Sequence, residues 1–251
     1  MPYFYHVLIY LLLSVSIWSS SYAASGNKVI FPDNGDWREI SVDATQYPVV
    51  YIPALGKKEG ALIIIQGKEE RRFERDIIAY LRTQLPEHDW STLGLNIPSA
   101  KLPKVLIAPE EQLSQSILLL KSEGHNKIYV LLYGEDAAKL LGHFIQQRVR
   151  DIQGVILLSA YAAERDDYDT LVKNIKSWRL YVYDIDAQFD YDFVKSDIKL
   201  RKKIFEETPG FYRQFSLPGA SNDYVDPREV LMKWIRGWML RHANLRPVVK
   251  P

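Results

Sequence analysis

The most informative stretch of the sequence is "IYVLLYGEDAAKLL", residues 128–141. Its first six residues are apolar or aromatic, which is typical of a strand buried on both faces. Gly134 then marks a sharp turn, and the residues from 136 to 149 repeat apolar side chains at helical spacing. A buried strand that turns directly into a helix is typical of an α/β protein with a parallel sheet.

The same alternation of strand and helix continues on both sides of this stretch. Six apolar runs begin at residues 61, 91, 127, 154, 179 and 212, and amphipathic stretches of helical length lie between them. Two short segments near the start, 38–42 and 49–53, read as an antiparallel pair. We therefore predict an α/β fold with an eight-stranded, mostly parallel sheet and helices on both faces. For the last helix we predict Asp226 as the cap and Pro227 in the first turn.

The length and composition fit one globular domain, which we place at residues 25–251. The chain has 251 residues, of which 47% are hydrophobic and 25% charged. Its net charge is +1, and charged runs such as 68–76 mix both signs, so we expect no nucleic-acid partner. We also expect no cofactor and no metal, because the chain has no cysteine and no clustered pair of histidines.

Residues 1–24 have the plan of a signal peptide. They contain no Lys, Arg, Asp or Glu, and the mostly apolar run 7–18 precedes small and polar residues. We predict cleavage after Ala23 or Ala24 and a mature protein that is periplasmic or secreted. The alternative is an uncleaved anchor, which would be the chain's membrane contact. The absence of cysteine excludes attachment of a lipid to a cysteine and excludes disulfides.

The number and order of the predicted strands resemble the α/β-hydrolase fold. This resemblance implies a nucleophile after the fifth strand, an acid after the seventh and a histidine after the eighth. The expected G-x-S-x-G motif reads Gly134, Glu135, Asp136, Ala137 and Ala138. Asp136 is then either a nucleophile, as in the dehalogenase and epoxide-hydrolase branches of the fold, or the cap of the following helix.

The other implied positions also depart from the pattern. Gln66 and Gly67 follow the third strand, where a backbone N–H can serve as an oxyanion donor or the glycine can simply end the strand. Asp184 or Asp186 occupies the position of the acid, and Asp186 fits better. The histidine position is Asn222, which takes no proton at neutral pH, so an ester on Asp136 would form and then stall.

The remaining candidates have simpler explanations. Ser159 reads as a loop hydroxyl, and Trp234 and Trp238 share a helix face that suits packing on the sheet as well as an interaction surface. Of the five histidines, His6, His88 and His125 are poorly placed to replace the missing base. His143 and His242 lie on predicted helices, where a surface or satisfied histidine is the more common case.

The end of the chain is similar to a group of uncharacterised bacterial envelope proteins with a signal peptide and an α/β-hydrolase-like fold. The similar segment is "PGASNDYVDPREVLMKWIRGW", residues 218–238. Many members of that group carry His at the position of Asn222 and Gly-His-Gly at residues 134–136. We expect a non-catalytic protein, or pseudoenzyme, that binds a small polar ligand or an envelope protein at the former active-site cleft, lined by Gln66, Asp136, Asp186 and Asn222. The alternative is a hydrolase of ester or alkyl bonds with Asp136 as nucleophile.

Overall fold

The structure is a computed structural model that describes residues 35–42, 45–66, 75–95, 109–135, 137–146 and 151–243. The predicted signal segment lies outside these residues, and so do Gly67 and Asp136. Within the described ranges, no helix is long and apolar enough to cross a membrane.

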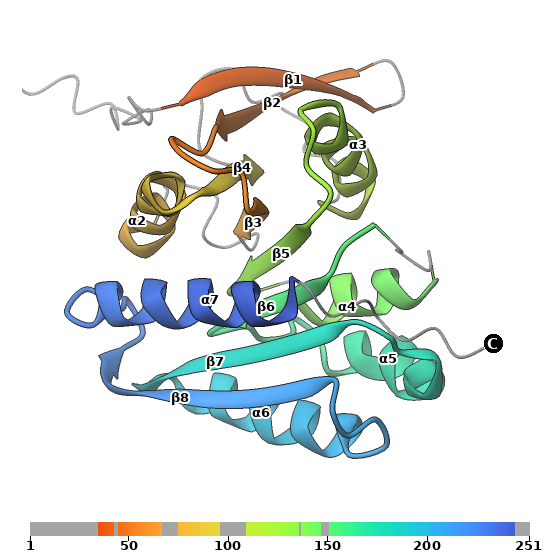
Figure 1. The fold of residues 1–251 in the computed structure, drawn as a ribbon. Helices are drawn as coiled ribbons and strands as arrows, with labels where there is room; N and C mark the ends of the chain where they lie inside the picture. Colours follow the sequence, from red (N-terminus) through yellow and green to blue (C-terminus); the bar gives the residue numbers. More distant parts are fainter. Residues whose placement is uncertain are drawn as a thin grey trace, which may run out of the picture. The chain divides into compact units, whose positions relative to one another are not determined.

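One eight-stranded sheet runs through the described residues in the order β1-β2-β4-β3-β5-β6-β7-β8 (Figure 1). β2 is antiparallel to β1 and to β4, whereas the other neighbouring strands are parallel. This topology confirms the predicted fold class, including the early antiparallel pair. The strands are β1 (Asp36–Val42), β2 (Thr45–Ile52), β3 (Gly60–Gln66), β4 (Trp90–Leu95), β5 (Ile128–Tyr133), β6 (Gly154–Leu158), β7 (Tyr181–Phe189) and β8 (Tyr212–Ser221).

Helices cover both faces of the sheet, so two apolar clusters form. α2 and α7 share one cluster with Leu131 of β5, and α3, α4, α5 and α6 share the other with Val130. Every residue of β5 is buried because neighbouring side chains point to opposite, equally covered faces. The helices are α2 (Asp76–Gln84), η2 (Leu85–His88), α3 (Pro109–Ser122), α4 (Ala137–Gln146), η3 (Arg165–Tyr168), α5 (Asp169–Asn174), η4 (Ile175–Ser177), α6 (Asp192–Phe205) and α7 (Arg228–His242).

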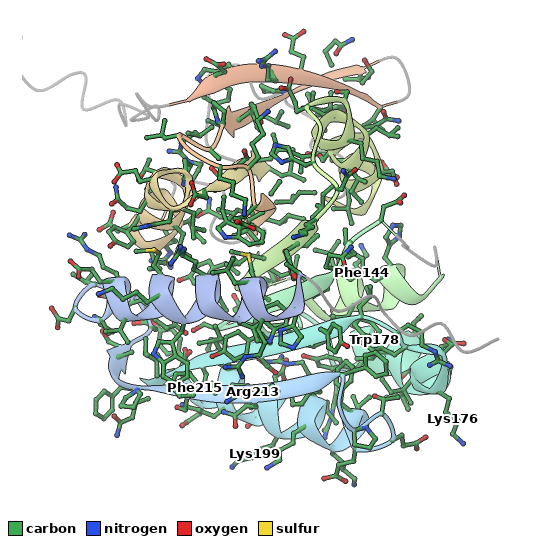
Figure 2. The ribbon with its side chains drawn as sticks, in the orientation of Figure 1. Phe144, Lys176, Trp178, Lys199, Arg213 and Phe215 are labelled. Carbon is green, nitrogen blue, oxygen red and sulfur yellow. The ribbon has the colours of Figure 1, made fainter. Side chains whose placement is uncertain are left out.

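Large apolar side chains lie inside these clusters and charged ones outside. Phe144 and Trp178 are buried, whereas Lys176 and Lys199 point to the outside (Figure 2). The helices thus cover both faces of the sheet, as is usual for parallel strands. Polar side chains that are buried between these layers need hydrogen-bond partners.

The structure corrects the predicted start of α7. The capping residue is Pro227, and no side chain caps the helix, so the prediction of Asp226 as the cap is wrong. The reason is that the Pro227 carbonyl already accepts the first helical bond, from the Leu231 N–H at 2.9 Å. Glu229 lies in the first turn, where the helix dipole favours a carboxylate.

A buried ion pair ties β7 to α6. Arg201 of α6 donates from Nε to Asp184 Oδ2 at 2.7 Å and from Nη2 to Asp184 Oδ1 at 3.0 Å, and neither side chain is exposed. The Nη1 group donates to the Ala160 carbonyl and to the Tyr168 hydroxyl, each at 2.8 Å. Tyr212 of β8 donates its hydroxyl to Asp184 Oδ2 at 2.6 Å. These contacts fix β7, β8, α6 and the chain after β6 relative to one another.

Removing the cation of this pair should cost far more stability than removing a surface cation. We expect Arg201→Met to lower the free energy of unfolding by about 3–5 kcal/mol, because Asp184 stays buried without its partner. The matched control, Lys202→Met on the exposed side of the same helix, should change it by less than about 0.5 kcal/mol. Urea denaturation of both variants measures the difference, and equal losses would contradict the proposed role of the pair.

Candidate functional site

The carboxyl ends of the parallel strands meet along one edge of the sheet. Gln66, which ends β3, pairs with Tyr133, which ends β5, and Tyr133 pairs with Leu158, which ends β6. β7 and β8 run further, because Leu158 pairs with Ile185 and the β7–β8 ladder continues to Phe189. Ligands in open α/β sheets bind outside this edge, so the side chains gathered here form the candidate site.

Gly134 makes the sharp turn that follows β5. Its φ is +76°, a left-handed conformation that glycine adopts without strain. The Gly134 N–H donates to the Leu158 carbonyl at 3.3 Å, and the Gly134 carbonyl accepts from the Tyr161 N–H at 2.9 Å. The turn is therefore held against the end of β6, as a strand-turn-helix elbow requires.

The first helical residues after this turn are small and buried. Glu135 is half-buried, and Ala137 and Ala138, the first residues of α4, have no exposed surface. Asp136, which stands between Glu135 and Ala137 in the sequence, lies outside the described residues. Its roles as nucleophile or helix cap therefore stay predictions.

Gln66 holds α2 to the end of β3. Its side chain is fully buried, and its Oε1 accepts a hydrogen bond at 2.9 Å from the backbone N–H of Arg75, the residue that caps α2. Its Nε2 has no hydrogen-bond partner within the part of the chain that the structure describes. The next residue, Gly67, was the predicted oxyanion position and lies outside the described residues.

The two predicted acids of β7 are both engaged by cations. Asp184 is bound by Arg201, as described above. Asp186 forms a salt bridge with Lys195 of α6 and accepts hydrogen bonds from Gln214 Nε2 at 2.9 Å and Ser216 Oγ at 3.0 Å. Asp186 is buried and lies within β7 rather than beyond it. Its carboxylate is fully used in joining β7, β8 and α6.

Asn222 lies beside the end of β5. The Tyr133 hydroxyl donates to the backbone carbonyl of Asn222 at 3.4 Å, so the loop after β8 returns to the strand that carries the turn. The residue at the expected histidine position is therefore brought close to the elbow, and it is half-buried.

Three of the described histidines lie far from the carboxyl edge, and the fourth lies along α4. His88 and His125 precede β4 and β5, and His242 ends α7 next to Tyr181 at the start of β7, so all three lie at the opposite edge of the sheet. His143 is the seventh residue of α4, roughly 9 Å along the helix from its first residue.

A second polar network at this edge joins three elements. Ser159, directly after β6, hydrogen-bonds through Oγ to the carboxylate of Asp190, directly after β7. The same Oγ lies 2.6 Å from the hydroxyl of Tyr224, in the loop between β8 and α7. Asp190 also accepts hydrogen bonds from the backbone N–H groups of Ala187 and Tyr191. Ser159 and Tyr224 are buried, whereas Asp190 is half-buried.

The direction of the hydrogen bonds in this network follows from the groups present. A carboxylate only accepts, so Ser159 gives its single hydrogen to Asp190. Tyr224 must then donate to Ser159. Burial raises the pKa of Tyr224 well above its ordinary value, although its contact with Ser159 opposes this, so the phenol keeps its proton. The order is Tyr224 to Ser159 to Asp190, with the negative charge at the outer end.

Backbone strain is concentrated in the same network. Ser159 has φ +42° and Tyr224 has φ +58°, a region that costs an L-residue roughly 1–2 kcal/mol. Asp89 is the other described non-glycine residue with positive φ. Strain of this kind clusters where function constrains the backbone, which supports a functional role for this edge.

Sequence reasoning missed this network. It treated Ser159 as a loop hydroxyl and looked for the acid at Asp186. A signal was present for Ser159, which lies at the end of a predicted parallel strand, but the predicted seventh strand stopped before Asp190, so the sequence did not mark Asp190. No local pattern marks Tyr224.

Exposed aromatic side chains stand next to Asp190. Tyr191 and Phe193 stack with ring centroids 5.2 Å apart, and Phe193 meets Tyr161 edge-on at 4.8 Å. Tyr191 is 56% exposed and Phe193 50% exposed, so water contacts about half of each side chain. We call Tyr161, Tyr191 and Phe193 the aromatic rim.

Comparison with known proteins shows the fold. Residues 32–115 match a family described as "Protein of unknown function (DUF3530)". No curated protein matches the chain. Among solved structures, a protein of unknown function from Agrobacterium tumefaciens is 16% identical, with a TM-score of 0.63 over 86% of this chain and 100% of that one.

Two hydrolases of known type are similar to the same degree. A monoglyceride lipase from Saccharomyces cerevisiae is 11% identical, with a TM-score of 0.62 over 88% of this chain and 99% of that one. A dienelactone hydrolase from Anabaena variabilis is 15% identical, with a TM-score of 0.59 over 83% and 98%. The chain therefore has the α/β-hydrolase fold, and identities this low say nothing about activity.

The Tyr224 hydroxyl should contribute to stability in a pH-dependent way. The folded chain holds the phenol proton because the pKa is raised, whereas the unfolded chain releases it near pH 10.0. The stabilising contribution is thus complete below about pH 10 and is lost as the pH rises further. Tyr224→Phe should lower the free energy of unfolding by about 1 kcal/mol at neutral pH and flatten its alkaline decline by up to about 1.4 kcal/mol per pH unit.

Urea denaturation between about pH 7 and about pH 11 measures both effects. The exposed Tyr191→Phe is the matched control and should leave the neutral value within about 0.5 kcal/mol. An unchanged alkaline decline in Tyr224→Phe would show that the phenol is not held in its neutral form by the fold.

Proposed function

We propose that the chain is a non-catalytic protein of the bacterial envelope that binds a small polar ligand at the carboxyl edge of its sheet. A cationic amine is the ligand class that this edge favours. In a broader form of the proposal, the same edge binds another protein of the envelope.

The observation that carries the proposal is Asn222 beside Tyr133. The histidine of a hydrolase takes a proton from the nucleophile or from water and later returns it. An amide at this position does neither at neutral pH. Asp186 does not replace it, because its carboxylate is bound to Lys195.

The ligand class follows from the charge and the rings next to Asp190. The carboxylate of Asp190 stays half-exposed at the end of its network, and the aromatic rim presents the stacked rings of Tyr191 and Phe193 beside it. Ring faces and a carboxylate together attract an ammonium group by electrostatics.

The alternative function is hydrolysis of an ester or alkyl bond by Asp136. The left-handed turn at Gly134 and the buried Ala137 and Ala138 favour it, because they retain an elbow for a nucleophile. A carboxylate of Asp136 would attack carbon and expel the leaving group with its electron pair. Water would then have to attack the resulting ester and give a proton to a base, and Asn222 is no base.

Placement in the envelope rests on the sequence. The signal-peptide plan of residues 1–24 and the similarity of residues 218–238 to envelope proteins support it. Cleavage after Ala23 or Ala24 would release the mature chain into the periplasm or the medium.

The first test is turnover. Purified mature protein should not hydrolyse short or medium acyl esters or haloalkanes. Any residual rate should equal that of the variants Asp136→Ala and Ser159→Ala, measured at the same protein concentration. Hydrolysis that is lost in Asp136→Ala would contradict the proposal and establish the alternative. Hydrolysis that is lost in Ser159→Ala alone would assign an unexpected nucleophile.

The second test is binding of a cation. Choline should bind to the wild type, and its neutral isostere 3,3-dimethylbutanol should not, because the ring faces and Asp190 attract charge. Tyr191→Ala should weaken choline binding by on the order of tenfold, as followed by NMR titration. Leu55→Ala, an exposed apolar residue elsewhere, is the control and should leave the affinity unchanged. Equal binding of both probes would exclude charge recognition at the rim.

A further inference from the structure

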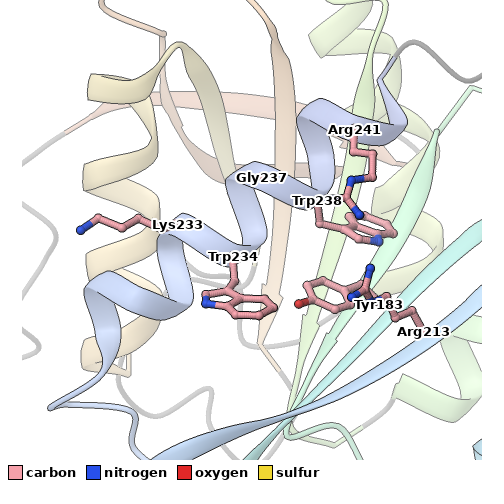
Figure 3. A pocket seen from close by; sticks show the side chains of 7 residues that line it. All are labelled: Tyr183, Arg213, Lys233, Trp234, Gly237, Trp238 and Arg241. Carbon is pink, nitrogen blue, oxygen red and sulfur yellow. The ribbon is translucent and has the colours of Figure 1, made fainter.

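A groove lies between α7 and the last two strands, away from the carboxyl edge. One hollow of about 270 Å³ is lined by residues of β7, β8 and α7 (Figure 3). A second hollow of about 260 Å³ adjoins it towards the starts of β7 and β8. The two hollows share Arg213, Trp238 and Arg241. We call both together the α7–β8 groove.

The groove is positively charged without an acidic counterpart. Arg213 and Arg241 line both hollows, and none of the described residues that line either hollow is Asp or Glu. Neither guanidinium forms a salt bridge within the described residues, and both side chains are exposed. Lys233 contributes less, because it points away from the rings in Figure 3 and pairs with Glu229 at 4.0 Å.

Both guanidinium groups act on the same two rings. Burial raises the pKa of Tyr183, and the charges of Arg213 and Arg241 oppose that rise. Burial lowers the pKa of His242, the backbone hydrogen bond to Trp238 opposes this, and the same two arginines lower it further. Two like charges held near the same side chains repel each other, and a bound anion would relieve that repulsion.

Aromatic rings form the wall of the groove. Tyr183 and Trp238 stack with centroids 5.3 Å apart, and Trp234 stacks on Phe215 at 4.2 Å. Trp234 is 41% exposed, whereas Trp238 is 6% exposed. Trp234 therefore offers apolar surface to a ligand, and Trp238 mainly packs the helix on the sheet.

The groove is separate from the carboxyl edge. Arg213 is the second residue of β8, and Asn222 follows its last residue. At roughly 3.3 Å per residue, the two positions lie some 30 Å apart along the strand. Asp184 and Asp186 also point away, because alternate residues of β7 face opposite sides of the sheet and Tyr183 faces α7. The groove thus forms an independent site, whatever the function of the carboxyl edge.

We propose that the α7–β8 groove binds a phosphate ester, whose oxygens lie between Arg213 and Arg241 and whose apolar part lies on Trp234. Paired guanidinium groups without acidic neighbours suit a dianion with several acceptor oxygens. A soluble phosphate ester and the headgroup of an anionic phospholipid share this chemistry.

The test uses the mature protein with phenyl phosphate as the probe and phenol as its neutral counterpart. Phenyl phosphate should bind and shift the NMR signal of the Trp234 indole N–H, and phenol should not. Arg213→Gln and Arg241→Gln should each weaken binding by on the order of tenfold, and the double variant by more. Arg165→Gln removes an equally exposed guanidinium elsewhere and is the matched control, which should bind as the wild type does.

A second arm distinguishes the two sources of phosphate. Cosedimentation with phosphatidylglycerol vesicles that is lost in the double variant, with phosphatidylcholine vesicles as the blank, would assign the site to a lipid headgroup. Binding of phenyl phosphate without cosedimentation would assign it to a soluble ester. Binding of neither probe, or equal weakening in Arg165→Gln, would overturn the proposal.

The melting temperature of the free protein distinguishes a binding role of the two arginines from a structural one. Removing one of two mutually repelling charges should leave the melting temperature of the free protein unchanged or raise it. A clear fall in both single variants would show that the arginines support the fold, and would overturn the reading of the groove as a site held open for an anion.

Discussion

The guanidinium of Arg201 lies fully buried against the carboxylate of Asp184, and the position of the candidate site follows from that contact. The pair joins α6 to β7, the Ala160 carbonyl brings in the chain after β6, and Tyr212 brings in β8. Ser159 is the neighbour of Ala160, so its place beside Asp190 depends on this anchor. A buried charge pair contributes little net stability by itself, but it allows few other arrangements of the groups that satisfy it.

The fold was predictable because its signals are local and repeated. Apolar runs of strand length alternate with amphipathic helices. Gly134 indicates the turn after β5 from the sequence alone, because the signal does not depend on tertiary contacts. The start of α7 was not predictable in the same way. Asp226 has the right residue type for a cap, but Pro227 takes the position, because its carbonyl accepts the first helical hydrogen bond, from the Leu231 N–H. Residue type alone did not show at which of the two adjacent residues the helix begins.

The candidate site was predictable in its location and only partly in its members. The strand order predicted that the candidate residues gather at one edge of the sheet, and Asn222 does lie near Tyr133 there. Which aspartate contacts Ser159 depends on how many residues of the chain belong to β7. β7 continues three residues past Asp186, so Asp186 is buried in a ladder while Asp190 emerges beside Ser159. A sequence shows where a run of apolar residues stops, but it does not show how far the hydrogen-bonded ladder continues.

The two ends of β7 and β8 differ in charge for a physical reason. At the carboxyl edge, carboxylates follow the strands and accept hydrogen bonds from backbone N–H groups, as Asp190 does from Ala187 and Tyr191. At the opposite end, α7 runs back over the sheet and brings its last turn, with Arg241, above Arg213 at the start of β8. Basic residues suit the last turn of a helix because its free carbonyls carry partial negative charge. The same antiparallel packing of α7 therefore separates the carboxylates of one edge from the arginines of the groove, so the two proposed ligands, which are opposite in charge, would bind at different ends of the same two strands.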